Sequence, residues 1–216
     1  MKVLSLGRAG LLQYVLRQLH AFFPDEQENL PALLEADLDQ ALERLHSCIN
    51  AVRLWPENQF DYLHSTQYAM FLYFLSNTIW RNRAEKIVCT KLFYLNKALN
   101  GIDCFYEVEL PSIFFIGHTV GIVLAKASYA DYLVLYQNST VGKNHGVAPV
   151  LGRGVVMYPN TAIIGRCDVK PGSVIAQGVS VINHDTPGNC LVFQAADGGL
   201  TCKPNERDIL ADIFRR

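Results

Sequence analysis

Two hydrophobic rhythms divide the chain, and the change falls near residue 101. In the first hundred residues apolar side chains recur at the spacing of one helix face, for example from Leu11 to Leu19, and Pro24 then ends the segment. The same spacing predicts three further helices over about 31–54, 62–82 and 84–99. We therefore expect an N-terminal half that is mainly helical.

A period of six replaces the helical rhythm after residue 101. A helix repeats about every 3.6 residues and a flat strand about every two, so neither would keep a strict period of six through so many glycines and prolines. A solenoid of short parallel strands does, because each hexad supplies one flat side and one corner, and inward side chains stack on the next coil. The inward register comprises Leu151, Met157, Ile163, Val169, Ile175 and Val181, and a small or β-branched corner register comprises Val155, Thr161, Cys167, Ser173 and Val179.

The same repeat extends upstream and then slips. Its inward positions continue back through Val141, Leu135, Tyr129 and Val123, but ten residues rather than twelve separate Val141 from Leu151. We therefore expect a loop to leave the solenoid around 142–149. The predicted class is α+β, with a helical domain over 1–100, a β-helix over 101–203, and a tail over 204–216 that forms at most one short helix.

Composition argues against several classes of protein. The 19 Lys and Arg against 20 Asp and Glu give a net charge of −1, too little positive charge for a nucleic-acid binder. The six cysteines lack CxxC spacing, which favours reduced thiols in a cytoplasmic protein. We expect no secretory signal and no membrane span, since the apolar stretches 68–80 and 110–125 are too short or too rich in Gly and Pro.

Two short motifs carry a resemblance to a known family. The segment 118–123, HTVGIV, resembles the catalytic His-x-x-Gly-Ile-Val segment of the hexapeptide-repeat acyltransferases, and 137–142, QNSTVG, resembles their Gln-x-x-Thr-Leu-Gly turn. Residues 151–181 then align without a gap to the final coils of that family. Over about 98–183 the chain is similar to the serine acetyltransferases in particular.

This resemblance implies a left-handed parallel β-helix that transfers acetyl from acetyl-CoA to a hydroxyl. It implies a homotrimer with active sites in the clefts between neighbouring subunits, and a helical N-terminal half that can pair two trimers. It implies a reaction that needs neither a metal nor a covalent enzyme intermediate. The partners it predicts are therefore acetyl-CoA, a small hydroxyl-bearing acceptor and further copies of this chain.

Such a transfer needs a base. A hydroxyl attacks a thioester poorly at neutral pH, so a positioned base must take its proton, and a carboxylate fixes the tautomer of a histidine base. By the resemblance His118 is that base, and Asp103, fifteen residues upstream, stands at the separation of the family's partner aspartate. The alternatives are a core histidine at 118 and a turn residue at 103, after Asn100-Gly101.

The resemblance also implies a groove for coenzyme A along the coils, where the cofactor contacts mostly backbone. Lys143, Arg153, Arg166 and Lys170 are candidates for its phosphates, and each is alternatively a solvated corner charge. By position in the family pattern, the residues that line the groove are Gly142, Lys143, Pro159, Asn160, Ala176, Gln177 and Gly178.

Departures from the family pattern concern the acceptor. Gly117 stands where the family has Asp before the catalytic histidine, and Val147-Ala148 stands where it has Arg-His. In the family those residues help to hold an amino acid, so their absence here weakens the case for serine. We therefore expect the acceptor to be a serine-like amino acid or a sugar.

Other residues are candidates for the acceptor side. His145, three residues before Ala148, either replaces the missing histidine from the adjacent subunit or is an exposed loop residue. Asp61 and His64, near a Pro-containing loop, are either acceptor-side groups or ordinary surface residues.

Two other function classes fit the repeat. A solenoid of this kind can be a scaffold without catalysis, or a regulator that binds a partner through its tail, although this tail ends in Phe-Arg-Arg rather than in the family's terminal isoleucine. A γ-class carbonic-anhydrase-like β-helix would need three zinc-binding histidines at one corner. His118, His145 and His184 are spaced by 27 and 39 residues, which does not align them there.

Overall fold

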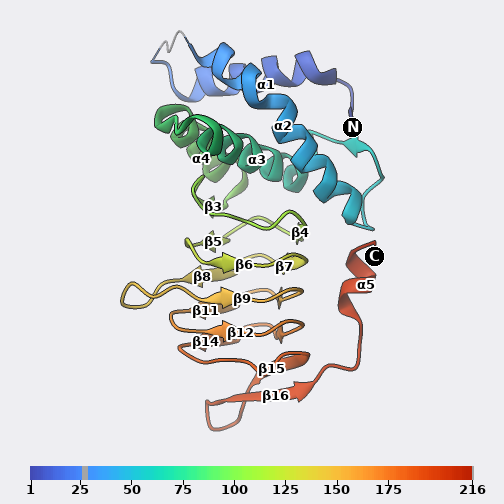
Figure 1. Ribbon diagram of the computed structural model, residues 1–216, viewed down its shortest axis with the longest axis vertical. Coiled ribbons are helices and arrows are strands. Elements are labelled where there is room, and N and C mark those ends of the chain that lie inside the picture. The colour runs from blue at the N-terminus through green and yellow to red at the C-terminus, as the bar shows by residue number, and fades with distance from the viewer. Residues whose placement is uncertain (26–28, 216) are drawn as a thin grey trace.

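A layer of helices caps one end of a stack of β coils in the computed structural model, which describes residues 1–25 and 29–215 (Figure 1). In that part of the chain no helix combines the length and the apolar character needed to cross a membrane. All four expected N-terminal helices are present. They are α1 (Gly7–Phe22), α2 (Leu30–Ala51), α3 (Ser65–Arg83) and α4 (Lys86–Asn100), beside which the short strands β1 (Lys2–Val3) and β2 (Gln59–Phe60) pair in parallel.

The apolar stretch at 68–80 forms the buried centre of the helical layer. Every residue from Thr66 to Ile79 in α3 is buried, because this helix packs against both α2 and α4. Its polar groups bond to the segment that leads into the solenoid. Asn77 donates to the carbonyl of Tyr106 at 2.8 Å, and the Tyr73 hydroxyl donates to that of Val108 at 2.9 Å. These bonds fix the helical layer on the first coil.

Parallel strands from successive coils build three sheets, and the expected fold class of helices followed by a parallel β-solenoid is confirmed. The β4 sheet holds β4 (Phe114–Ile116), β7 (Leu133–Leu135), β10 (Val156–Met157), β13 (Val174–Ile175), β15 (Cys190–Gln194) and the antiparallel β16 (Leu200–Pro204). The β5 sheet holds β3 (Asp103–Cys104), β5 (Val123–Leu124), β8 (Thr140–Gly142), β11 (Ala162–Ile164) and β14 (Ser180–Ile182). The β6 sheet holds β6 (Ser128–Tyr129), β9 (Val150–Leu151) and β12 (Asp168–Val169).

The period of six brings equivalent residues inside on successive coils. All the inward residues from Leu151 to Val181, and all the corner residues from Val155 to Val179, are buried. Upstream, the prediction is wrong at Val123, which is 43 % exposed, whereas the neighbouring Leu124 is buried. Side chains alternate between the faces of a strand, so one of these two must point outward. Leu124 and Tyr129 are five positions apart instead of six, so this side of the first coil is one residue short. The regular repeat begins after it.

One corner of the solenoid is built from residues in the left-handed conformation. Gly121, Asn138, Asn160 and Gly178 have φ values of 74°, 59°, 61° and 77° on successive coils. Glycine and asparagine tolerate this conformation best, which explains their recurrence here. Asn138 also donates a side-chain hydrogen bond to Asn160 across 2.8 Å.

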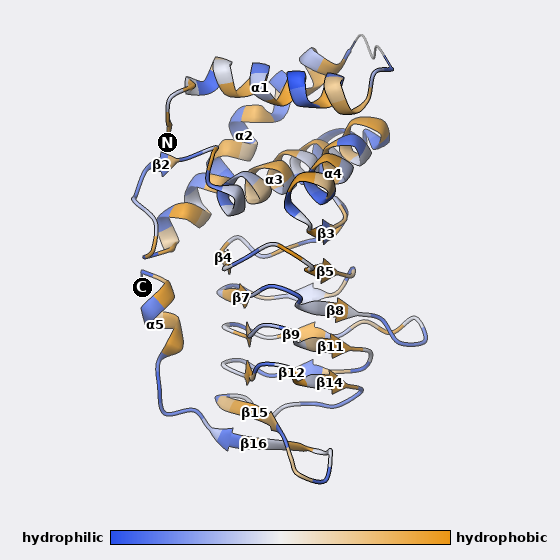
Figure 2. Ribbon diagram, turned by 180° about the vertical axis from the view of Figure 1, so that it is seen from behind, coloured by the Kyte–Doolittle hydropathy of each residue, from blue (hydrophilic) through white to orange (hydrophobic). Residues whose placement is uncertain are grey.

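Two segments depart from the regular stack. The loop between β8 and β9 leaves the solenoid as expected and turns between Asn144 and Val147 (Figure 1). At the far end β15 and β16 form an antiparallel pair, after which the chain returns along the coils through α5 (Ile209–Ile213). Figures 1 and 2 both show α5 beside the solenoid and the chain end near the helical layer. This is the short last helix expected in the tail.

Candidate acyl-transfer site

His118 lies at the corner that follows β4, on the first coil below the helices. Its neighbour Thr119 is only 5 % exposed and closes the turn by accepting from the Ile122 N–H at 3.2 Å. The His118 side chain is exposed and makes no hydrogen bond to another described residue. The imidazole is therefore free to bind a ligand, which a buried core histidine would not be.

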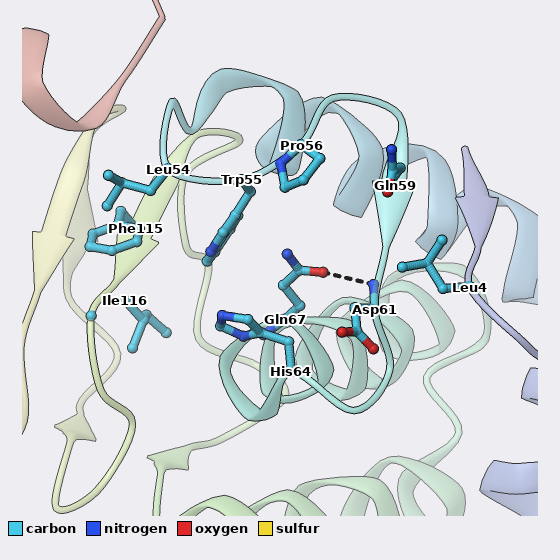
Figure 3. A pocket seen from close by; sticks show the side chains of 11 residues that line it. Leu4, Leu54, Trp55, Pro56, Gln59, Asp61, His64, Gln67, Phe115 and Ile116 are labelled. Carbon is cyan, nitrogen blue, oxygen red and sulfur yellow. Dashed lines mark hydrogen bonds between the residues drawn. The ribbon is translucent and has the colours of Figure 1, made fainter.

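A cavity of about 430 Å³ opens beside this corner, between the helical layer and β4 (Figure 3). Gly117, which directly precedes His118, lines it from the solenoid. Asp61 and His64 line it from the helical layer, so the fold brings these two sequence candidates to the same cavity as the residue before the candidate base. The remaining lining residues are Leu4, Leu54, Trp55, Pro56, Gln59, Gln67, Phe115 and Ile116.

Polar groups converge on the cavity from the start of α3. Gln67 is only 3 % exposed, and its Oε1 accepts from the Asp61 N–H at 2.9 Å, which leaves the amide nitrogen pointing into the cavity (Figure 3). One carboxylate oxygen of Asp61 accepts from the Leu63 N–H at 2.9 Å. The imidazole of His64 caps α3 by accepting from the Gln67 N–H and packs edge-on against Trp55. An amide donor, a carboxylate and an imidazole thus face one cavity, which suits a ligand with hydroxyl or amino groups.

Aromatic rings continue this wall down the solenoid. Phe115 packs against Trp55 on one side and Tyr136 on the other, and Tyr136 stacks on Tyr158 with ring centroids 5.5 Å apart. Burial, followed by the neighbouring Tyr158, raises the pKa of the Tyr136 hydroxyl. The phenol therefore stays neutral at physiological pH.

Asp103 has a different partner from the one that the resemblance implies. Its carboxylate accepts from the Lys97 ammonium at 2.6 Å, and its backbone pairs with Val123 in the β5 sheet. Neither carboxylate oxygen bonds to His118 in the described chain. The structure thus places Asp103 on the coil of His118, ion-paired to the end of α4.

Several residues expected to line the coenzyme A groove stack below His118. The Asn160 N–H donates to the carbonyl of Gln137 at 3.1 Å, and the Gly178 N–H donates to that of Pro159 at 3.0 Å. Ala176 and Gln177 belong to the same corner on the coil of Gly178. The sequence did not predict Gln137 as a site residue. In the structure its Oε1 is buried and has no hydrogen-bond partner in the described chain, which makes it a candidate to bind a ligand. An orphaned buried acceptor in this column was not visible from residue spacing.

The other expected residues lie elsewhere. Gly142 and Lys143 are at the opposite end of β8 from this corner, and His145 lies in the adjoining loop with a φ of 47°. This loop therefore starts at the end of β8 remote from the corner that follows the β4 sheet. Among the phosphate candidates, Lys170 pairs with Asp168, and the Arg153 guanidinium lies 4.2 Å from the centre of the Tyr132 ring.

No cluster of three or more His, Cys, Asp or Glu side chains that could hold a metal is present in residues 1–25 and 29–215. The six cysteines are free, and all except Cys202 are buried. Burial raises the pKa of the Cys48 and Cys89 thiols to about 12. These thiols stay protonated, so they are poor nucleophiles.

The fold of the chain matches that of solved serine acetyltransferase structures. That of Neisseria gonorrhoeae in complex with serine has a TM-score of 0.65 at 17 % identity, over 91 % of this chain and 88 % of that one. Serine acetyltransferase isoform 3 of Entamoeba histolytica in complex with cysteine has a TM-score of 0.60 at 16 % identity, over 90 % and 73 %. A serine acetyltransferase in complex with CoA gives 0.55 at 14 %, over 91 % and 77 %.

No family model matches the sequence, and no curated protein matches it. The chain has the fold of the serine acetyltransferases, which confirms at the level of structure the resemblance read from its motifs.

Proposed function

We propose that this protein is an O-acetyltransferase that moves acetyl from acetyl-CoA to the hydroxyl of a small acceptor. The observation that carries the proposal is an exposed imidazole at His118 that makes no hydrogen bond in the described part of the chain. It directly follows Gly117, which lines a cavity to which Asp61, His64 and Gln67 contribute polar groups. Solved relatives in fold include one complex with CoA and one with serine, which supports these two kinds of ligand.

In the proposed reaction His118 takes the proton of the acceptor hydroxyl as its oxygen attacks the thioester carbon. The new C–O bond gives a tetrahedral oxyanion, which backbone N–H groups at the corner stabilise. The C–S bond then breaks, and the imidazolium returns its proton to the departing thiolate. Asp103 is the proposed positioning group for the imidazole, in a role that competes with its ion pair to Lys97.

The donor would lie along the column of Pro159, Asn160, Ala176, Gln177 and Gly178, below His118. Gly142, Lys143 and His145 belong to the proposal only in a trimer, where the loop after β8 of one subunit reaches the corner of the next. A trimer, or two trimers paired through their helical layers, is therefore part of the proposed active form.

The composition of the cavity bears on the acceptor. Among the described residues that line it, Asp61 is the only Asp, Glu, Lys or Arg, so no cation there would pair with the carboxylate of an amino acid. Trp55 offers an aromatic face, and Gln59, Gln67 and Asp61 offer planar groups that bond adjacent hydroxyls. These features favour a sugar over serine, with the serine-like acceptor as the second candidate.

An acceptor panel tests the proposal. Purified protein is mixed with acetyl-CoA and, separately, serine, homoserine and nucleotide sugars, and thiol release is followed with a chromogenic disulfide. Five of the six cysteines are buried, so the protein itself contributes little signal. Release that depends on one acceptor supports the enzyme, whereas no release with any acceptor favours the catalytically silent scaffold.

A further inference from the structure

The segment after β16 runs back along the solenoid and ends against the helical layer (Figures 1 and 2). It is anchored by Phe214, which is fully buried and meets the Tyr132 ring edge-on at 5.1 Å. Phe214 also forms an antiparallel bridge with Val52. We call residues 205–215 the return segment.

The return segment bonds to the chain just beyond α2. The Arg53 N–H donates to the carbonyl of Ile213 at 2.7 Å, and the Arg215 N–H donates to that of Ala51 at 2.8 Å. Because α2 ends at Ala51, its last carbonyls have no partner inside the helix. A cation placed there also meets the negative end of the helix dipole.

The Arg215 guanidinium lies among several acceptors at this point. Its Nη1 donates to the carbonyls of Asn50 and Val52 at 3.1 and 2.6 Å. Its Nη2 donates to those of Arg53 and Trp55 at 3.4 and 2.8 Å. Its Nε pairs with the Glu57 carboxylate at 2.9 Å. Four carbonyls and one carboxylate thus surround the planar guanidinium, an arrangement that the three donors of a single lysine ammonium cannot reproduce.

The loop that Arg215 holds is also the outer wall of the cavity beside His118. Leu54, Trp55 and Pro56 line that cavity, and the carbonyls bound by Arg215 lie on both sides of Leu54. Trp55 packs against Phe115 from the solenoid and His64 from α3. A shift of this backbone would therefore move the Trp55 ring within the cavity.

We propose that Arg215 is a positioning residue for the acceptor cavity, through which the return segment holds Trp55 in place. The proposal rests on the proposed function, because it concerns the acceptor of that reaction. Arg215 lies outside the cavity lining, so its effect is on acceptor binding and not on the chemical step.

The kinetic test compares Arg215→Ala and Arg215→Lys with a control, Arg207→Ala. The Arg207 guanidinium forms an exposed ion pair with Asp212 within the same segment. We expect both Arg215 variants to raise the acceptor KM by about tenfold, with kcat changed by less than about threefold and the KM for acetyl-CoA unchanged. Arg207→Ala should behave as wild type. Equal acceptor KM values in all three variants would overturn the proposal.

A fluorescence readout separates this proposal from the proposed function. Trp55 and Trp80 are the two tryptophans, so Trp80→Phe leaves Trp55 as the sole reporter. In that background Arg215→Ala should make Trp55 more accessible to acrylamide, and Arg207→Ala should not. If no acceptor is turned over, the proposed function fails, while unchanged quenching refutes positioning by Arg215. Glu57→Gln, which weakens the same contact, replaces Arg215→Ala if that variant does not fold.

Discussion

The ring of Tyr136 covers the backbone of Gly117, the residue before the candidate base. A Cβ at position 117 would lie 2.6 Å from two carbons of that ring. Tyr136 cannot simply turn aside, because Phe115 and Tyr158 pack against it. The aspartate that the serine acetyltransferase pattern has at this position is therefore incompatible with Tyr136.

Replacing Gly117 with Asp should destabilise the protein, because the new side chain must displace a packed ring. We expect a loss of about 1–3 kcal/mol in the free energy of unfolding, measured by chemical denaturation. In Gly117→Asp/Tyr136→Ala the clash is absent, so the two substitutions should cost less together than the sum of their separate effects. Strict additivity would show that the ring does not restrict position 117.

Asp103 forms an ion pair with Lys97. Variants of these two residues therefore distinguish a role of Asp103 in orienting His118 from a purely structural role. If Asp103 orients His118, Asp103→Asn should lower kcat by about tenfold or more. Lys97→Ala removes the same ion pair without touching the carboxylate, so its kcat should stay near that of wild type. Equal losses of kcat and of melting temperature in the two variants would leave Asp103 as a structural residue only.

Asp61 contributes the carboxylate of the cavity, and Asp61→Ala should raise the acceptor KM by about tenfold, the effect of losing one charged hydrogen bond. Asp39→Asn is a suitable control, since its carboxylate pairs with Arg8 away from this cavity. Initial rates at varied acceptor concentration measure both. An unchanged KM in Asp61→Ala would place the acceptor elsewhere.

The outer face of the β5 sheet carries exposed apolar side chains, and the proposed trimer would pack a neighbouring subunit against it. Ile182 is 52 % exposed on this sheet, and Val123 is exposed on the same sheet. We expect light scattering to give three or six times the chain mass of 24.2 kDa. Ile182→Asp should reduce this to the mass of one chain, because a charge is costly in an apolar interface. Ile87→Asp, on α4, should leave at least a trimer. A monomeric wild type would refute this assembly.

The repeat made the solenoid predictable because one geometrical constraint acts on every coil. Each inward position must be aliphatic to stack on the next, so the aliphatic residues at every sixth position from Leu151 to Val181 predict the solenoid. The sequence predicted Val123 to point inward, but the first coil is one residue short and the register shifts by one. Successive side chains of a strand point to opposite faces, so Leu124 is buried in place of Val123. No local pattern marks such a coil in advance.

The site was less predictable than the fold, because its parts come from distant segments. Asp61 and His64 meet Gly117 only through the packing of the helical layer on the first coil. The contacts of Arg215 with the loop after α2 span about 160 residues of chain and follow no motif. The family resemblance predicted Asp103 as the partner of His118, whereas its ion pair with Lys97 depends on where α4 ends.

Replacement of the His118 imidazole tests the mechanism most directly. Acetyl-CoA and the acceptor identified from the panel are given to wild type, to His118→Ala and to His184→Ala, an exposed histidine at the far end of the solenoid. Thiol release measures turnover, and circular dichroism confirms folding. We predict that His118→Ala remains folded and loses about 10²- to 10⁴-fold in kcat, while His184→Ala keeps its activity. Turnover by folded His118→Ala at the wild-type rate would contradict the proposed mechanism.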